Sequence, residues 1–178
     1  MKNTRLRAMV EGAVCVALAY ALSFIKLDLW FQGGSINLVM IPLLIYASRR
    51  GAFWGILAGA VFGTIKCFFA GGFAWGWQSI LLDYIVAYAA VGLGGLFQGK
   101  KNGLVVGTLV GCTARFAVHF VSGITIYKIL APTELFSVTY TSPALYSLVY
   151  NISYMLPNTI LAFVLCLLLQ KSLSRIPG

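Results

Sequence analysis

The sequence predicts an all-α membrane protein with six transmembrane helices, whose N-terminus and C-terminus are both cytoplasmic. Of its 178 residues, 60% are hydrophobic and only 10% are charged, too few to cover the surface of a soluble domain. Several apolar runs are long enough to cross a bilayer, which takes about 20 residues per helix. The basic residues lie in short clusters between these runs, as the positive-inside rule describes.

The apolar runs define six expected spans along the chain. They cover about residues 6–25, 36–48, 53–69, 77–97, 104–130 and 144–169. The first follows a basic N-terminal segment but continues to Ile25 without a cleavage site, so we interpret it as a span and not as a removable signal peptide. The second is short and contains Pro42, so we expect a kinked or tilted helix. Residues 26–35 and 131–142 are expected to form loops on the outer side.

The placement of Lys and Arg predicts the orientation. With the N-terminus inside, the inner segments hold the pairs 49–50 and 100–101 and the basic residues at both ends of the chain, whereas the outer loops hold only Lys26 and Lys128. The net charge of +9 therefore belongs to membrane topology and does not indicate nucleic-acid binding. Because the spans use up most of the chain, we expect one integral-membrane substrate-binding domain over residues 1–178.

Several function classes lack their motifs. The chain has no Gly-rich phosphate loop, so any ATP hydrolysis must come from another protein. The four cysteines lie in different apolar runs without a Cys-x-x-Cys pair, and we expect neither a disulfide nor a metal site. No paired acids or Ser-His-Asp order stands out, so we predict no enzyme activity and no cofactor.

Asp83 is the one acid well inside an expected span. A carboxylate there costs roughly 2.5–3.5 kcal/mol, so it should face protein, water or a ligand rather than lipid. In the predicted orientation Asp83 lies about 9 Å from the outer end of its helix, given the helical rise. His119 and Asn151 fall at a similar depth in later spans, and Arg115 shares a helix face with His119.

These polar groups are accompanied by tyrosines, at positions 84, 127, 146, 150 and 154. A carboxylate with aromatic faces suits a planar organic cation, through ion pairing and cation–π contact. Two structural interpretations stay open: Arg115 neutralises Asp83, and His119 makes only a helix–helix hydrogen bond.

Other features also have two interpretations. Ala13, Ala17 and Ala21 lie four residues apart on one face of the first span, where they either pack inside the chain or dock a partner subunit. Trp30, in the first outer loop, is either an interfacial anchor or part of a site. Lys66 is expected to extend to the membrane interface.

The motifs together resemble a known family, over essentially the whole chain. In the first half of the chain they comprise Gln-Gly-Gly-Ser at 32–35, Met-Ile-Pro at 40–42, Arg-Arg-Gly at 49–51 and Leu-Asp-Tyr-Ile-Val-Ala at 82–87. In the second half they comprise Arg115, His119, Ser-Gly at 122–123 and the segment from Tyr146 to Asn151. In order and spacing the chain resembles the thiamine-specific substrate-binding (S) components of energy-coupling factor (ECF) transporters, the ThiT family.

The resemblance implies a thiamine site near the outer surface of a bacterial cell-membrane protein. Asp83 would hydrogen-bond the aminopyrimidine ring, and Tyr127 would stack on the ligand. The other expected site residues are Tyr84, Arg115, His119, Gly123, Tyr146, Asn151 and Trp30, of which Trp30 aligns least cleanly.

The resemblance also implies partners. A transmembrane coupling subunit (EcfT-like) with two ATPase subunits would dock on the face of Ala13, Ala17 and Ala21. One alternative is the same architecture for riboflavin or a hydroxymethylpyrimidine precursor. Another is a self-sufficient secondary transporter of an organic cation.

Overall fold

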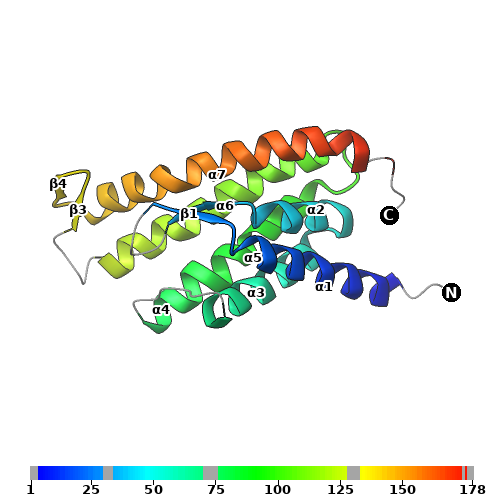
Figure 1. The fold of residues 1–178 in the computed structure, drawn as a ribbon, viewed down its shortest axis with the longest axis horizontal. Coiled ribbons are helices and arrows are strands. Elements are labelled where there is room, and N and C mark those ends of the chain that lie inside the picture. Colours follow the sequence, from blue (N-terminus) through cyan, green and yellow to red (C-terminus); the bar gives the residue numbers. More distant parts are fainter. Residues whose placement is uncertain (1–3, 30–33, 70–75, 128–132, 174, 176–178) are drawn as a thin grey trace.

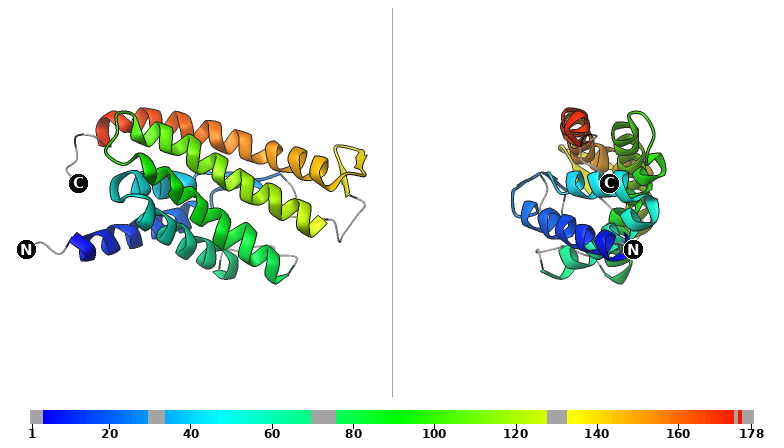
Figure 2. Two further views of the ribbon diagram at one scale, coloured as in Figure 1. Left: turned by 180° about the vertical axis from the view of Figure 1, so that it is seen from behind. Right: turned by 90° about the vertical axis from the view of Figure 1, so that its right-hand side faces the viewer.

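A computed structural model shows a bundle of helices that run along one long axis (Figure 1). It describes residues 4–29, 34–69, 76–127, 133–173 and 175, without the side chains of Tyr127 and Thr133. Both ends of the chain lie at one end of the bundle, and a short β-hairpin lies at the other. The views in Figure 2 show the same arrangement from behind and from one end.

Successive helical segments alternate in direction along this axis. The helices are α1 (Thr4–Leu22), α2 (Met40–Arg50), α3 (Ala52–Phe69), a continuous segment of four elements, α6 (Gly103–Tyr127) and α7 (Pro143–Leu173). The four elements of the continuous segment are α4 (Trp77–Ser79), the π-helix η1 (Ile80–Val86), α5 (Ala87–Val91) and the 3-10 helix η2 (Gly92–Phe97). Two strand pairs complete the described fold: β1 (Lys26–Asp28) with β2 (Ser35–Asn37), and β3 (Thr133–Leu135) with β4 (Val138–Tyr140).

Four of these segments are long and apolar enough to cross a membrane. They are Ala52–Phe69, Trp77–Phe97, Gly103–Ile126 and Pro143–Leu173. Their outer surfaces carry exposed side chains such as Leu57, Val121 and Leu168, which is the pattern of helices in contact with lipid. Helix α2 has 11 residues and is too short to cross by itself. The membrane character of the chain is thus confirmed, and the count of six spans stays a prediction.

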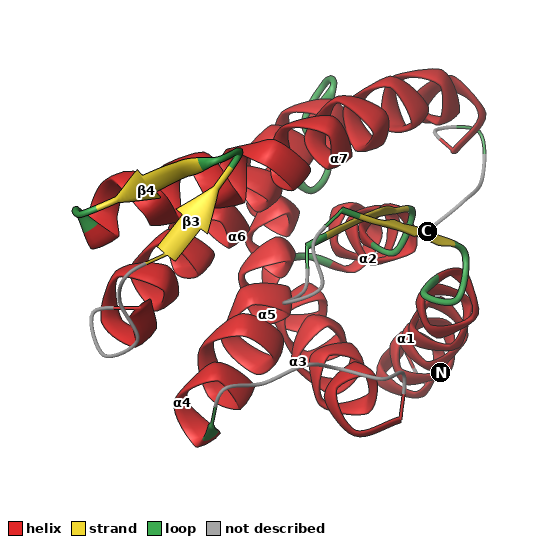
Figure 3. Ribbon diagram, turned by 60° about the vertical axis from the view of Figure 1, so that its left-hand side comes forward, coloured by secondary structure: helices red, strands yellow, loops and turns green. Residues whose placement is uncertain are grey.

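The start of the second expected span was wrong. Residues 35–37 are extended and pair antiparallel with β1, and the helix begins only at Met40. Pro42 therefore lies in the first turn of α2, where a backbone N–H has no partner within the helix and a proline is tolerated. Figure 1 shows β1 between α1 and the rest of the bundle, and β2 contacts α7. Figure 3 draws the strands in yellow among the red helices.

The Asn158 side chain binds β2 to α7 through two hydrogen bonds. The Asn37 backbone N–H donates to Oδ1 of Asn158 in α7 at 3.0 Å, and Asn158 Nδ2 donates to the Ser35 carbonyl at 2.8 Å. Asn158 is buried, so these bonds form away from solvent. They fix the first outer connection against α7 through side chains more than 120 residues away in the sequence.

Glycines set the distance between α3 and the helix of Asp83. A Cβ added at Gly63 would collide with the Tyr84 carbonyl, and one at Gly59 would collide with the Tyr88 carbonyl. The two backbones therefore pack in direct contact, as small residues permit in membrane helix pairs. This close packing fixes the position of the Asp83 helix relative to α3.

Candidate functional site

Asp83 lies on an irregular turn of its helix. Residues Ile80–Val86 form a π-helix between the α-helical elements α4 and α5. A π-helical turn changes the direction in which side chains leave the helix, and such turns are frequent at functional sites. The sequence predicted a helix here but not its irregular geometry.

The Asp83 carboxylate is held by two neighbours. Nδ1 of His119 in α6 donates to Asp83 Oδ1 at 3.1 Å, and Ser79 Oγ, one turn earlier, donates to Asp83 Oδ2 at 2.7 Å. The Asp83 side chain keeps 25% of its surface accessible, against 10% for His119. The structure thus brings together the acid and the histidine that the sequence singled out.

Arg115 does not neutralise Asp83. In the described part of the chain no ion pair joins them, and the Arg115 guanidinium instead lies over the Tyr88 ring, 4.3 Å from its centroid. The structural pairing considered for Asp83 and Arg115 is therefore not observed. Lys66 also differs from expectation: Nζ points inward and donates to the Tyr88 hydroxyl at 2.9 Å instead of extending to the interface.

Two buried nitrogen atoms in this region have no hydrogen-bond partner among the described residues. They are Nε2 of His119 and Nε of Arg115, and the two residues are buried, with 9% and 6% of their surface exposed. Because Nδ1 of His119 donates to the Asp83 carboxylate, Nε2 of a neutral ring is the acceptor atom. Buried polar atoms are almost always paired, so unpaired ones in a cluster indicate groups available to a ligand.

Asn151 lies beside this cluster and already has partners at both ends of its amide. Nδ2 donates to the carbonyls of Ser147 and His119 at 2.8 and 3.3 Å, and Oδ1 accepts from the Tyr154 hydroxyl at 2.8 Å. The amide therefore ties α7 to the backbone of α6 at His119. Tyr154 in turn meets the His119 ring edge-on, with centroids 6.3 Å apart.

A row of tyrosines extends along α7 from Asn151. Tyr146 and Tyr150 are buried and stacked, with ring centroids 5.8 Å apart, and Tyr140 of β4 packs edge-on against Tyr146. The hairpin thus covers the aromatic row at the end of the bundle away from the termini. Tyr84 lies on the π-helix next to Asp83 and is half-buried.

Gly123 allows α6 and α7 to approach each other here. A Cβ at this position would collide with Ser147 Oγ, which donates to the Phe120 carbonyl at 2.9 Å. In this structure Gly123 therefore acts on helix packing one turn beyond His119. Trp30 and the side chain of Tyr127 lie outside the described residues.

The three alanines of α1 are all exposed. Ala13, Ala17 and Ala21 face away from the bundle. The buried positions of the helix are Ala8, Gly12, Val16 and Ala19. Of the two interpretations of this small-residue face, packing inside the chain does not occur.

Three residues of the cluster were not predicted from the sequence or were expected in another role. Ser79 precedes Asp83 by four residues, a spacing that places both on one helix face, so it could have been found. Tyr88 and Lys66 meet across two helices. No sequence pattern marks their contact, because it depends on the packing of α3 against the Asp83 helix.

Known proteins match the chain over nearly its whole length. The family described as "Thiamine transporter protein (Thia_YuaJ)" matches residues 9–177. The thiamine transporter ThiT of Bacillus subtilis (strain 168) is 33% identical, over 96% of this chain and 94% of that protein. Both descriptions are of transporters, and this chain is not an enzyme.

Solved structures share the fold. The structure of ThiT from Listeria monocytogenes superimposes with a TM-score of 0.80 at 23% identity, over 96% of each chain. The S component of a bacterial ECF transporter gives 0.67 at 14% identity, over 96% of this chain and 97% of that one. With a family match from residue 9 to residue 177, this chain belongs to the thiamine transporter protein family.

Proposed function

We propose that this chain is the high-affinity thiamine-binding S component of an ECF-type vitamin transporter. It captures thiamine from outside the cell and delivers it inward together with an ATP-driven partner module. The observation that carries the proposal is the Asp83–His119 pair, in which a partly accessible carboxylate is held by a histidine and a serine and is not neutralised by Arg115.

The chemistry of thiamine matches the free groups of this pair. The exocyclic amino group of the aminopyrimidine can donate to Asp83 or His119 Nε2, and its ring nitrogens can accept from Arg115. The positive charge of the thiazolium ring suits the tyrosine faces, since a cation over an aromatic ring gains about 0.5–2 kcal/mol. We assign to the ligand the residues Asp83, Tyr84, Arg115, His119, Gly123, Tyr127, Tyr146, Asn151 and Trp30.

A titration of the detergent-purified chain against a vitamin panel tests the ligand. The panel contains thiamine, riboflavin and a hydroxymethylpyrimidine, and the readout is intrinsic Trp and Tyr fluorescence. We expect saturable quenching by thiamine at concentrations well below those needed for the others, because the site is lined by aromatic rings. Saturation by riboflavin instead would show that the chain binds another vitamin. The absence of quenching by thiamine would contradict stacking of the ligand on aromatic rings.

The partner side of the proposal rests on α1. We propose that its exposed face of Ala13, Ala17 and Ala21 receives a transmembrane coupling subunit, which works with two ATPase subunits. In this arrangement the chain crosses the cell membrane six times with both termini in the cytoplasm. Small side chains four residues apart let another helix approach closely, which supports this role for an exposed face.

Enlarging the face tests the docking. Ala17→Leu should abolish thiamine uptake by cells while thiamine binding to the purified chain stays unchanged, because the side chain points away from the bundle. Ala117→Leu, at an exposed position of α6, is the matched control and should leave uptake intact. Uptake into liposomes that contain this chain alone would instead indicate a self-sufficient secondary transporter.

A further inference from the structure

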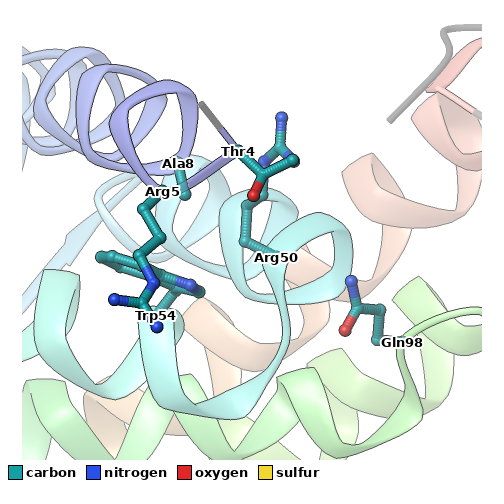
Figure 4. Close-up of a pocket in the computed structure, with 6 residues that line it drawn as sticks. All are labelled: Thr4, Arg5, Ala8, Arg50, Trp54 and Gln98. Atoms are coloured by element: carbon teal, nitrogen blue, oxygen red, sulfur yellow. The ribbon is translucent and has the colours of Figure 1, made fainter. Parts of the chain in front are cut away.

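A small cavity opens at the end of the bundle that carries both termini, far from Asp83. Its volume is about 160 Å³, and it is lined by Thr4, Arg5, Ala8, Arg50, Trp54 and Gln98. Figure 4 shows these side chains, with Thr4 and Arg5 on α1, Arg50 at the end of α2 and Trp54 on α3. The thiamine site proposed above does not use any of them.

The cavity has more positive charge than its surroundings neutralise. Glu11 is the acid nearest to it along α1, and its carboxylate already accepts from Arg50 at 2.6 Å through both oxygens and from Arg7 at 3.1 Å. The Arg5 side chain makes no ion pair or hydrogen bond with the residues that the structure describes. No acid occurs in the first described turn of α1.

The donors around the cavity suit a phosphate group. A guanidinium binds phosphate oxygens with two parallel N–H groups. The Thr4 hydroxyl is a further donor. Among the residues that the structure describes, the cavity lining contains no carboxylate that would repel an anion.

The rim of the cavity points to a lipid as the source of that phosphate. Leu6, Met9 and Val10 of α1 are 56%, 59% and 56% exposed and form an apolar surface next to Arg5. Trp54, with an apolar ring and one N–H donor, is the side chain typical of the membrane–water interface. A free phosphate ion would use the arginines but gain nothing from this apolar surface.

We propose that this cavity binds the phosphate headgroup of an anionic phospholipid, with Arg5 and Arg50 as its charged contacts and the acyl chains along α1. Basic pockets between membrane helices are the sites that anionic headgroups occupy. The bound lipid would connect α1, α2 and α3 at the end of the bundle where Glu11 and Arg50 already join two of them. This inference is independent of the thiamine site.

The proposal is tested by measuring which lipids the purified chain retains. The chain is reconstituted in nanodiscs with equal amounts of phosphatidylglycerol and phosphatidylcholine, and lipids retained after release are counted by native mass spectrometry. We expect retention of phosphatidylglycerol over phosphatidylcholine by at least about fivefold. Arg5→Gln should reduce this ratio to near one. Lys101→Gln removes the same charge from an exposed position at the same end and should leave the ratio unchanged.

The remaining outcomes are decisive as well. Thiamine titration of Arg5→Gln should match the unsubstituted chain, which separates lipid loss from misfolding and from failure of the thiamine proposal. Loss of the retained phosphatidylglycerol in 100 mM inorganic phosphate would assign the cavity to free phosphate and overturn the lipid assignment. Equal retention of both lipids, or an equal fall in Arg5→Gln and Lys101→Gln, would also overturn it.

Discussion

Two acids at opposite ends of the bundle have opposite surroundings. Glu11, near the termini, is shared by two arginines through three hydrogen bonds between 2.6 and 3.1 Å. Asp83 is held by one histidine and one serine, and the buried Arg115 nearby lies on Tyr88 instead. The first acid is paired with two arginines, whereas the second has no Lys or Arg partner in the described structure.

The difference separates a structural ion pair from a candidate site. Arg50 is only 13% exposed, so its charge needs a partner, and Glu11 supplies it while joining α1 to α2. An intramembrane acid without such a partner is costly and persists where a ligand completes its environment. Burial alone does not distinguish the two acids, because Glu11 and Asp83 are 28% and 25% exposed.

The largest expected effect is the loss of thiamine affinity in Asp83→Asn. Replacing the carboxylate removes a charged hydrogen-bond acceptor in a low-dielectric site, which costs about 3 kcal/mol, or roughly a 100-fold rise in Kd. Fluorescence titration or calorimetry of the purified variant measures it. Asp28→Asn makes the same change on β1, where the acid is exposed and paired with Lys26, and should bind normally. An unaltered Kd in Asp83→Asn would remove this residue from the site.

Glu11→Gln should act on stability and not on binding. Without the carboxylate, the mostly buried Arg50 guanidinium loses its charge partner, and we expect a loss of about 1–2 kcal/mol, since the pair is partly solvated. Thermal unfolding in detergent shows this as a lowered Tm. The double variant Glu11→Gln, Arg50→Gln should regain part of the loss, because no charge is left unpaired. Reduced thiamine affinity in properly folded Glu11→Gln would contradict a purely structural role for Glu11.

The smallest effect separates the two nitrogens of His119. His119→Asn retains a donor near the position of Nδ1 and thus the bond to Asp83, whereas His119→Gln retains a polar atom near Nε2. If the unpaired Nε2 meets thiamine, His119→Asn should bind more weakly than His119→Gln, by about 1 kcal/mol, or roughly fivefold. Titration of both variants measures the difference. The reverse order would mean that His119 acts mainly by holding Asp83.

Much of the fold followed from the apolar runs. The expected spans 53–69, 77–97 and 144–169 lie within one or a few residues of the described helices, because glycines, prolines and basic pairs interrupt the runs where the helices end. The expected span 36–48 was too long at its start. Its apolar residues continue into β2, and hydrophobicity alone does not separate a strand from the first turn of a helix.

For the candidate site, the sequence singled out residues but did not predict which of them are in contact. A lone acid in an apolar run identified Asp83, and a four-residue spacing placed Arg115 and His119 on one face. Which of the two reaches Asp83 depends on the π-helical turn and on the rotation of α6, and the structure selects His119. The inward turn of Lys66 depends in the same way on Tyr88, which no spacing connects to it.

Composition and charge distribution by themselves determined that this chain is a membrane protein and predicted a functional site around one intramembrane acid, because the cost of placing charge in lipid leaves few alternatives. Only the tertiary structure decided which charged or polar side chain pairs with which partner. Helix rotation and glycine-permitted contacts, such as those of Gly59 and Gly63 with the Asp83 helix, set these pairings at distances of a few ångströms. Such distances depend on packing between segments far apart in the chain, which a sequence pattern does not encode locally.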